Sequence, residues 1–203
     1  MLSILTWNTQ GDPRNDPEKD AILQSLCLTY DVVLLQECGR LAEQRIYAGK
    51  QIHGQAQAGA LNPRCSTAVV ANGCVGAGVW TGSSSGRSAV WVKIRDVVIA
   101  SIHCESGGIG MTDLRRCMRQ MATIGPKIII GGDFNCSFAP DEELVNAGTT
   151  GRPVEFSLHT QPRPTHSGGG ILDHFVSVGM QNVGVRRQRL PRSDHDAVSA
   201  TFR

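Results

Sequence analysis

The sequence predicts an α/β protein built as a layered sandwich of strands and helices. Short apolar runs typical of buried strands recur through the whole chain. Amphipathic helical segments are interposed in both the N-terminal and the C-terminal half. The chain shows no internal repeats, and its 203 residues, 40% of them hydrophobic, suit one domain spanning residues 1–203.

The N-terminal elements follow from their apolar patterns. Leu2–Trp7 is expected to form the first strand, which a Gly-Asp-Pro turn follows. Glu18–Tyr30 repeats its apolar residues at the spacing of one helix face. Asp31–Glu37 indicates a second buried strand, which ends on a carboxylate. Leu41–Pro63 is polar and rich in Ala, Gly and Gln, so we expect a short helix and a long loop there.

Strands dominate the rest of the chain. Two of them meet in a tight hairpin at Arg95-Asp96. A helix is expected at Thr112–Ile124, where the apolar residues share one face, and a short helix near Asp141. The expected strands are Ser66–Ala71, Val75–Trp80, Ala89–Arg95, Val97–Cys104, the segment leading to Asp133, Ile171–Val178, Val183–Arg189 and Ala197–Phe202.

The bulk composition narrows the classes of protein. A formal net charge of +2 does not by itself indicate a polyanion partner, although arginines cluster at 115–119 and 186–192. Seven cysteines without a Cys-x-x-Cys pair disfavour a structural zinc site and favour reduced thiols, with one disulfide left open. No apolar run reaches transmembrane length. The N-terminus lacks a signal-peptide pattern, so the chain is either leaderless or a trimmed form.

The run from Lys127 to Asn135 is the most informative stretch. Three isoleucines indicate a strand buried on both faces, and two glycines then let the backbone turn tightly or let a ligand come close. Asp133 and Asn135 follow, and residues two apart on an extended chain point to the same side. We therefore expect both side chains to face one site; an ordinary turn is the alternative.

Polar residues end other strands in the same way, and ligand sites in layered α/β folds form at strand ends. Clustered carboxylates repel one another unless a cation lies among them, and hard oxygen ligands favour Mg²⁺ over Zn²⁺. A nearby histidine supplies proton transfer near neutral pH. The candidates for one shared site are Asn8, Gln10, Glu37, His103, Asp133, Asn135, Asp173, Asp194 and His195.

Five motifs in this order resemble the endonuclease/exonuclease/phosphatase superfamily, which includes deoxyribonuclease I. They are Thr6-Trp7-Asn8-Thr9-Gln10-Gly11, Leu35-Gln36-Glu37, Ile102-His103, Gly132-Asp133-Phe134-Asn135 and Ser193-Asp194-His195. Four motifs most closely resemble the catalytic B subunits of cytolethal distending toxins: Trp7–Gly11, Gln36-Glu37-Cys38-Gly39, Ser106-Gly107-Gly108 and Gly168–Asp173. The resemblance covers essentially the whole chain. It implies a four-layer α/β/β/α sandwich of two packed mixed β-sheets flanked by helices.

The resemblance also implies roles around a metal ion. Glu37, Asp194 and Asn8 would bind the divalent cation, directly or through water. Asp133 would orient or deprotonate the attacking water, and Asn135 would hold a phosphate oxygen.

Further roles concern the phosphate and the leaving group. His195 would contact the scissile phosphate with its ring oriented by Asp173, and His103 would protonate the leaving sugar oxygen. Arg64 and Arg87 match arginines that bind phosphates in the toxin family. Arg192, close to Asp194-His195, would add positive charge beside the phosphate.

The chain departs from the family pattern in places. It is shorter than typical relatives, with a compressed loop between Glu37 and Arg64. Asn62-Pro63 stand where deoxyribonuclease I carries a carboxylate that steadies the first histidine, so we expect His103 to depend on solvent or backbone. His174 replaces the usual tyrosine after Asp173.

Plainer interpretations exist for the same residues. His103 on an apolar strand is, taken alone, more often a core histidine, and Asp194-His195 fits a simple turn. The arginines at 186–192 fit a solvated face, as do those at 115–119. No role is assigned to His53, His159 or His166.

Together these expectations define a Mg²⁺-dependent DNA endonuclease, with Mn²⁺ or Ca²⁺ as alternative ions, that leaves 5′-phosphate and 3′-hydroxyl ends. A toxin or effector nuclease fits them, secreted or translocated into a target cell and acting there, with the nucleus as a candidate site. Delivery subunits or a cognate inhibitor are the expected partners. The alternatives are a phosphoinositide or sphingolipid phosphoesterase on the same fold and an inactive binding module; the complete set of catalytic groups argues against the latter.

Overall fold

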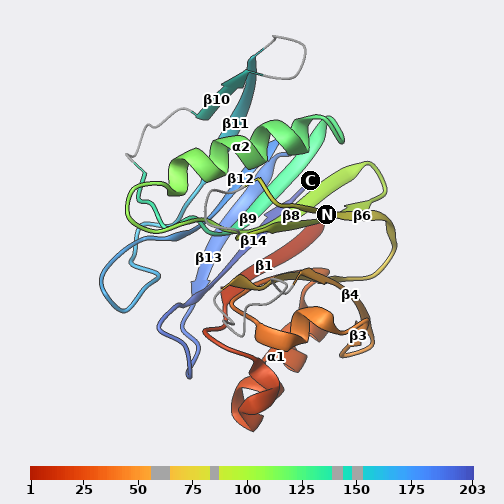
Figure 1. The fold of residues 1–203 in the computed structure, drawn as a ribbon, viewed down its shortest axis with the longest axis vertical. Helices are drawn as coiled ribbons and strands as arrows, with labels where there is room; N and C mark the ends of the chain where they lie inside the picture. The colour runs from red at the N-terminus through yellow and green to blue at the C-terminus, as the bar shows by residue number, and fades with distance from the viewer. Residues whose placement is uncertain (56–64, 83–86, 139–143, 148–152) are drawn as a thin grey trace.

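Two mixed seven-stranded β-sheets form the centre of the molecule (Figure 1). The computed structural model describes residues 1–55, 65–82, 87–138, 144–147 and 153–203. The first sheet has the order β13 (Asn182–Gln188), β14 (Ala197–Phe202), β1 (Leu2–Asn8), β2 (Val32–Gln36), β5 (Thr67–Ala71), β4 (Lys50–Gln55) and β3 (Ile46–Tyr47). The second has the order β10 (Leu144–Ala147), β11 (Pro153–His159), β12 (Asp173–Val178), β9 (Lys127–Asp133), β8 (Val97–His103), β7 (Ala89–Ile94) and β6 (Cys74–Trp80).

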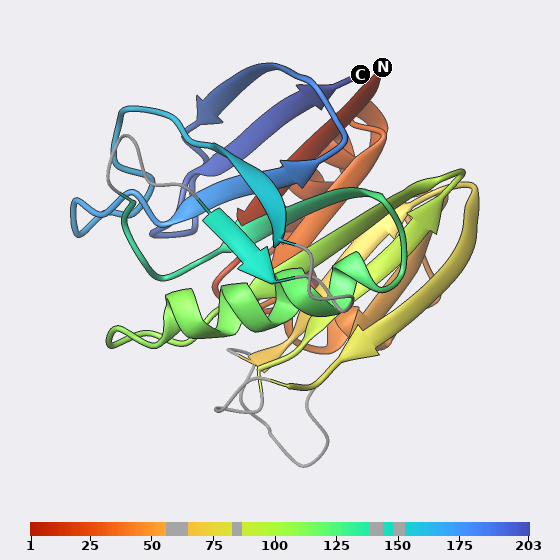
Figure 2. The ribbon, with the colours of Figure 1, turned by 90° about the horizontal axis from the view of Figure 1, so that it is seen from above.

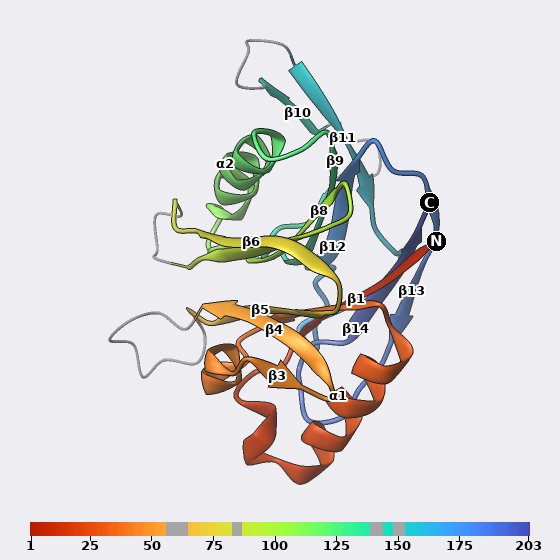
Figure 3. The same cartoon turned by 90° about the vertical axis from the view of Figure 1, so that its right-hand side faces the viewer.

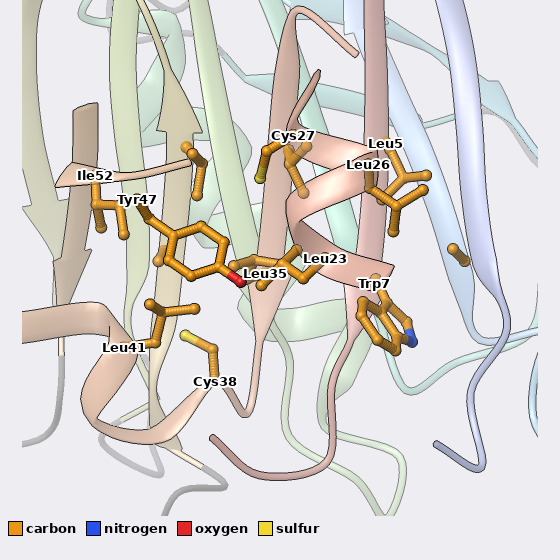
Figure 4. Close-up of a cluster of buried hydrophobic side chains, with 14 of the residues drawn as sticks. Leu5, Trp7, Leu23, Leu26, Cys27, Leu35, Cys38, Leu41, Tyr47 and Ile52 are labelled. Atoms are coloured by element: carbon orange, nitrogen blue, oxygen red, sulfur yellow. The ribbon is translucent and has the colours of Figure 1, made fainter. Parts of the chain in front are cut away.

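Three apolar clusters divide the molecule into four layers. One lies between the sheets and contains Ile99, Ile129 and Phe175. A second joins the first sheet to helix α1 (Pro17–Thr29), with Leu23 from the helix among its members (Figure 4). A third joins the second sheet to helix α2 (Gly110–Ala122). Figure 3 shows the two helices on the outer faces, and the predicted α/β/β/α sandwich is confirmed.

Local sequence explains where the helices begin. The side chain of Asp16 accepts hydrogen bonds from the first free N–H groups of α1, and Pro17 occupies the first turn, where its missing N–H costs nothing. Short 3-10 helices η1 (Pro13–Asn15) and η2 (Gly39–Glu43) follow β1 and β2.

Among the described residues, no helix has the length and apolar character needed to cross a membrane.

Most predicted elements are confirmed to within two residues of their expected ends. The ends of the chain lie side by side because β1 and β14 pair antiparallel, with Leu2 opposite Phe202 (Figure 2). Each sheet contains a parallel pair, β1 with β2 and β8 with β9.

Two regions differ from expectation. The long loop predicted within Leu41–Pro63 instead contains β3 and β4, of which β4 pairs with β5 at the sheet edge. A short helix was expected to begin near Asp141, and this starting point lies outside the described residues. The described residues that follow form β10 and β11, an antiparallel pair that was not predicted. β3 is only two residues long and the sequence of β4 is mostly polar, so neither carries the apolar pattern on which strand prediction depends.

Gly131 and Gly132 were expected to permit a tight turn or the approach of a ligand, but in the structure they permit close packing within and between the sheets. A side chain at Gly131 would meet the ring of Phe175 at 2.5 Å and Leu34 of the other sheet at 2.8 Å. A Cβ atom on Gly132 would lie 1.9 Å from the carbonyl oxygen of Ile102. Both glycines lie within β9 and permit close packing between strands and sheets, and the chain does not turn until after Asp133.

Candidate active site

One polar pocket of about 230 Å³ brings together most of the predicted site residues. It lies where the ends of β1 and β2 in one sheet meet the ends of β8 and β9 in the other. Asn8 and Asp173 are buried next to residues of the pocket. The lining residues are Gln10, Glu37, Arg87, His103, Ser106, Asp133, Asn135, His166, Asp194 and His195.

Strand register places three of these groups in a row across the second sheet. His103 ends β8 opposite Asp133 of β9, and Asp133 lies opposite Asp173, the first residue of β12. All three side chains are buried. The row therefore depends on pairing between segments far apart in the sequence, and a slip of one residue would turn each side chain to the other face.

His195 is held in this row by Asp173. Its Nδ1 donates to Asp173 Oδ2 at 2.9 Å, and its Nε2 lies 3.6 Å from Asp133 Oδ2. The Thr165 hydroxyl accepts the backbone N–H groups of Leu172 and Asp173, which fixes the start of β12. With Nδ1 committed to Asp173, Nε2 is the ring nitrogen that faces the pocket.

Burial and charge shift the pKa values of this pair upward. Burial and the neighbouring charge of Asp173 raise the pKa of Asp133 from 3.8 to about 7, against the opposing effects of His195 and Asn8. Burial alone would lower the pKa of His195, but the hydrogen bond and charge of Asp173, with the charges of Asp133 and Asp194, outweigh it and raise the pKa to about 9. His195 is therefore an imidazolium at neutral pH.

The first sheet contributes Asn8 and Glu37 from the ends of two adjacent parallel strands. Asn8 Nδ2 donates to Asp133 at 3.0 Å and to Glu37 at 3.4 Å, while its Oδ1 accepts the N–H of Gln10. Glu37 has a φ of +52°, a left-handed conformation that is costly for a side chain of this kind. Backbone hydrogen bonds to Gly11 and Ser66 hold it there.

Asn135 faces the pocket because of a turn in the backbone, where an extended strand had been expected. Its φ of +49° is left-handed, so the alternation of an extended strand does not apply beyond Asp133. Its N–H donates to Asp133 Oδ1 and its Nδ2 to the carbonyl of Cys104. The expected convergence of Asp133 and Asn135 on one site is thus confirmed, but an Asx-type turn produces it.

Arg87 lies directly against His103. Its Nη1 donates to His103 Nε2 and to the Cys104 carbonyl, each at 2.7 Å. An arginine keeps its protons, so His103 Nε2 accepts and carries no proton in this arrangement. The ring is thus oriented by a side chain, where solvent or backbone had been expected. His103 Nε2 also lies 3.5 Å from Asp133 and 3.8 Å from Glu37.

The structure adds His166, to which sequence reasoning assigned no role. Its Nδ1 accepts the N–H of Gly168, so Nε2 is the nitrogen that faces Asp194, at 3.4 Å. The ring packs against His195 at 4.8 Å between centroids. Only its position just before the glycine loop could have indicated this contact from sequence.

The donor set fits a divalent cation of the hard, oxygen-binding kind. Glu37 and Asp194 line the pocket together with Asp133. Asp194 Oδ2 accepts from Gln10, while its buried Oδ1 has no hydrogen-bond partner among the described residues. Several carboxylates in one pocket repel one another, and a bound cation would offset that repulsion. The amide nitrogen of Asn8 faces the carboxylates, so direct ligation by Asn8 stays a prediction.

The predicted phosphate-binding arginines have different placements. Arg87 lines the pocket, and Arg64 lies outside the described residues. Arg192 donates to Glu18 at 2.8 Å, lies 3.7 Å from Asp16 and does not line the pocket. Its phosphate role stays a prediction that this placement does not support. All seven cysteines are free, so the open disulfide is not formed.

Comparisons with known proteins agree with this arrangement. The profile of the Endonuclease/Exonuclease/phosphatase family matches residues 5–195. No curated protein sequence matches the chain. Solved structures do: the Haemophilus ducreyi cytolethal distending toxin is 19% identical with a TM-score of 0.69, over 98% of this chain and 97% of that chain.

Two further structures share the fold. CdtB, described as the biologically active subunit of cytolethal distending toxin, is 17% identical with a TM-score of 0.74, over 100% of this chain and 98% of that chain. A 3′-5′ exonuclease of Neisseria meningitidis is 15% identical with a TM-score of 0.67, over 99% of each chain. At these identities the likeness establishes the fold.

Proposed function

Because the chain belongs to the endonuclease/exonuclease/phosphatase family, we propose that it is a Mg²⁺-dependent endonuclease that hydrolyses DNA. The observation that supports this most strongly is the buried trio of Asp133, Asp173 and His195, in which the strand register sets two carboxylates opposite each other and an imidazolium against both. Such a trio combines an acceptor of raised pKa with a charged hydrogen-bond donor, which is what hydrolysis of a phosphodiester requires.

The mechanism assigns one task to each residue. Asp133 receives a proton from the attacking water, because its raised pKa makes it a stronger base than an ordinary aspartate. His195 donates from Nε2 to a non-bridging phosphate oxygen and offsets the charge that builds there. Asn135 holds a second phosphate oxygen. A divalent cation held by Glu37 and Asp194 would supply Lewis-acid neutralisation of the phosphate charge.

His103 and Arg87 act together on the leaving side. Departure of the 3′ oxygen of the sugar requires a proton, which His103 can give only after Arg87 has released its Nε2 atom and that atom has taken up a proton from solvent. An incoming phosphate is the partner that draws the guanidinium away, since a bidentate arginine–phosphate contact is stronger than one to a neutral imidazole. The products are 5′-phosphate and 3′-hydroxyl ends.

The direct test is nicking of supercoiled plasmid with Mg²⁺, abolished by EDTA. His195→Ala and Asp133→Ala should each lose activity, whereas Glu43→Ala on the surface should not. Full activity in either active-site variant would overturn the mechanism. Phosphate release from soluble inositol phosphates without nicking would instead favour a phosphoinositide phosphoesterase, and release of phosphocholine from sphingomyelin would favour a sphingolipid phosphoesterase.

The biological setting follows from the same likeness. We propose a toxin or effector nuclease that acts inside a target cell, where the nucleus would supply its DNA. The cytolethal distending toxins that it resembles are the basis for expecting delivery subunits. A cognate inhibitor protein is the alternative partner. Co-purification of the tagged chain with products of neighbouring genes tests this proposal.

A further inference from the structure

We propose that Arg163, Arg186 and Arg189 form an arginine groove that binds successive phosphates of a DNA strand as it leaves the active pocket. The inference rests on the proposed nuclease function and deepens it, because it makes the substrate a polynucleotide rather than a small phosphate ester. The three residues come from the loop before Pro164 and from the end of β13.

Two further hollows connect the active pocket to these arginines. The pocket shares His166 and Asp194 with a second hollow of about 290 Å³. That hollow shares Arg187 and Arg189 with a third, of about 470 Å³. A chain-like ligand seated at the scissile position therefore has a continuous path along the surface toward β13.

Three of the four arginines along this path are not neutralised by the protein. Arg187 lies 2.5 Å from Asp196, and this ion pair accounts for both of their charges. The guanidinium groups of Arg163, Arg186 and Arg189 are exposed and have no carboxylate partner within the described residues. Unpaired arginines that repel one another around one hollow are stabilised by a polyanion.

The backbone beneath the arginines is firmly held. The buried side chain of Gln161 accepts the N–H of Arg163 at 3.1 Å and donates to its carbonyl oxygen, which leaves the Arg163 side chain turned outward. Arg186 lies opposite Ser199 in the β13–β14 ladder. The groove is thus displayed on an ordered strand and a closed turn, so it needs little reorganisation to bind a ligand.

The separation between the active pocket and the arginine groove favours a DNA strand over a small phosphate ester as the ligand. The scissile pocket already provides His195, Asn135 and Arg87 for one phosphate. The arginine groove lies beyond His166, so it can bind only phosphates other than the scissile one. Contacts of this kind position the strand without reading its sequence, and their strength falls with salt.

The test compares two double variants with the same change of charge. Arg186→Gln/Arg189→Gln removes the groove, and Arg116→Gln/Arg119→Gln removes two exposed arginines of α2, which lies on the other sheet. Binding of a labelled DNA duplex is followed by fluorescence anisotropy in EDTA, so that no cleavage occurs. Circular dichroism and thermal unfolding confirm that both variants fold.

The groove variant should bind the duplex more weakly, and its affinity should change less with salt. Loss of two phosphate contacts should shrink the affinity ratio between about 50 and about 200 mM salt by roughly tenfold relative to the unchanged protein. With Mg²⁺, its hydrolysis of a p-nitrophenyl phosphodiester should stay unchanged while plasmid nicking falls. The α2 variant should match the unchanged protein in all three measurements.

Other outcomes overturn the inference in distinguishable ways. Equal weakening in both double variants would show a general effect of charge. Unchanged binding with plasmid still nicked would mean that DNA takes another path, and the proposed function would survive. Absence of duplex binding together with absence of diester hydrolysis in the unchanged protein would remove the proposed function and the groove with it.

Discussion

Asp133 is the residue on which the contacts of the site converge. Its carboxylate accepts hydrogen bonds from Asn8 at 3.0 Å and from the N–H of Asn135 at 3.0 Å, and both histidines lie within 3.6 Å. Burial beside a second carboxylate raises its pKa, so it holds a proton more readily than a surface aspartate does. A base tuned in this way suits the proposed activation of water.

Asp173→Asn should reduce hydrolysis far more than it reduces stability. The substitution keeps the shape of the side chain but removes the charge that fixes the His195 tautomer and keeps the ring protonated. By analogy with catalytic triads, we expect a loss on the order of 10³–10⁴-fold in single-turnover nicking. Asp31→Asn, the same change at the start of β2 and away from the pocket, serves as the control. Activity within tenfold of the unchanged protein would rule out the assigned role.

Stability of the metal-free protein should fall as the pH rises from about 7 to about 9. His195 has a pKa raised from 6.5 to about 9, so its stabilisation is complete below pH 6.5 and is lost as the pH passes through 9. Asp133, with a pKa raised from 3.8 to about 7, acts in the same direction between those values. Burial lowers the pKa of His159 to about 4 and also lowers that of His174, so these two rings oppose Asp133 over this lower range. The His195 contribution is about 3 kcal/mol.

Urea unfolding in EDTA at pH 5, 7 and 9 measures this dependence. His195→Gln should flatten the profile between pH 7 and 9. Asp133→Asn should make stability increase from pH 5 to pH 7, because His159 and His174 then act without opposition. A stability that increases from pH 7 to pH 9 in the unchanged protein would contradict the direction of the His195 shift.

At the residue scale, the sequence identified the site residues that belong to a local motif. Glu37, Asp133 and His195 were found because each stands at a recognisable strand end. His166 was missed, since only the pairing of its loop with His195 brings it to the pocket. The contact between Arg87 and His103 was likewise hidden, because it depends on how β7 and β8 pair.

At the scale of elements, β9 positions the site by lying close to its neighbours. Gly132 lets β9 approach β8 so closely that Asp133 comes level with His103. The pairing of β8, β9 and β12 thus itself sets the row of His103, Asp133 and Asp173. The long apolar strands were predictable from sequence, whereas β3 and β10 are short and β4 is mostly polar, so these strands carry no clear apolar pattern. β11 was missed as well.

Gly132→Ala should destabilise the protein strongly. The new methyl group would lie 1.9 Å from the Ile102 carbonyl, so β8 and β9 would have to separate. We expect a loss of about 3–5 kcal/mol in the free energy of unfolding, measured by urea denaturation. Gly184→Ala on edge strand β13, where a Cβ atom meets nothing within 4 Å, should cost about 0.5 kcal/mol or less. Similar losses in the two variants would contradict the packing argument.

At the scale of the whole molecule, the two sheets divide the pocket between them. The first supplies Glu37 and Asn8 from its strands, and the second supplies His103 and Asp133. A cation held by Glu37 and Asp194 would bridge carboxylates whose repulsion otherwise opposes the packing of the chain around the pocket.

Mg²⁺ should therefore raise the melting temperature of the folded protein. At a concentration about 100 times the Kd, binding to the native state adds about 2.7 kcal/mol. Glu37→Gln/Asp194→Asn should abolish the increase that Mg²⁺ produces in differential scanning fluorimetry, and the control Glu43→Gln should keep it. An equal increase in all three proteins would place the cation elsewhere.

The division of the pocket between two sheets has a consequence for folding. The second sheet is built from one continuous stretch, Cys74 to Val178, and the first from the two ends of the chain. Either sheet formed alone carries only part of the groups that line the pocket. If both parts are needed for hydrolysis, activity during refolding should begin only when Phe175 and its apolar neighbours have packed between the two sheets. The appearance of the first hydrolysis product would then time the association of the sheets.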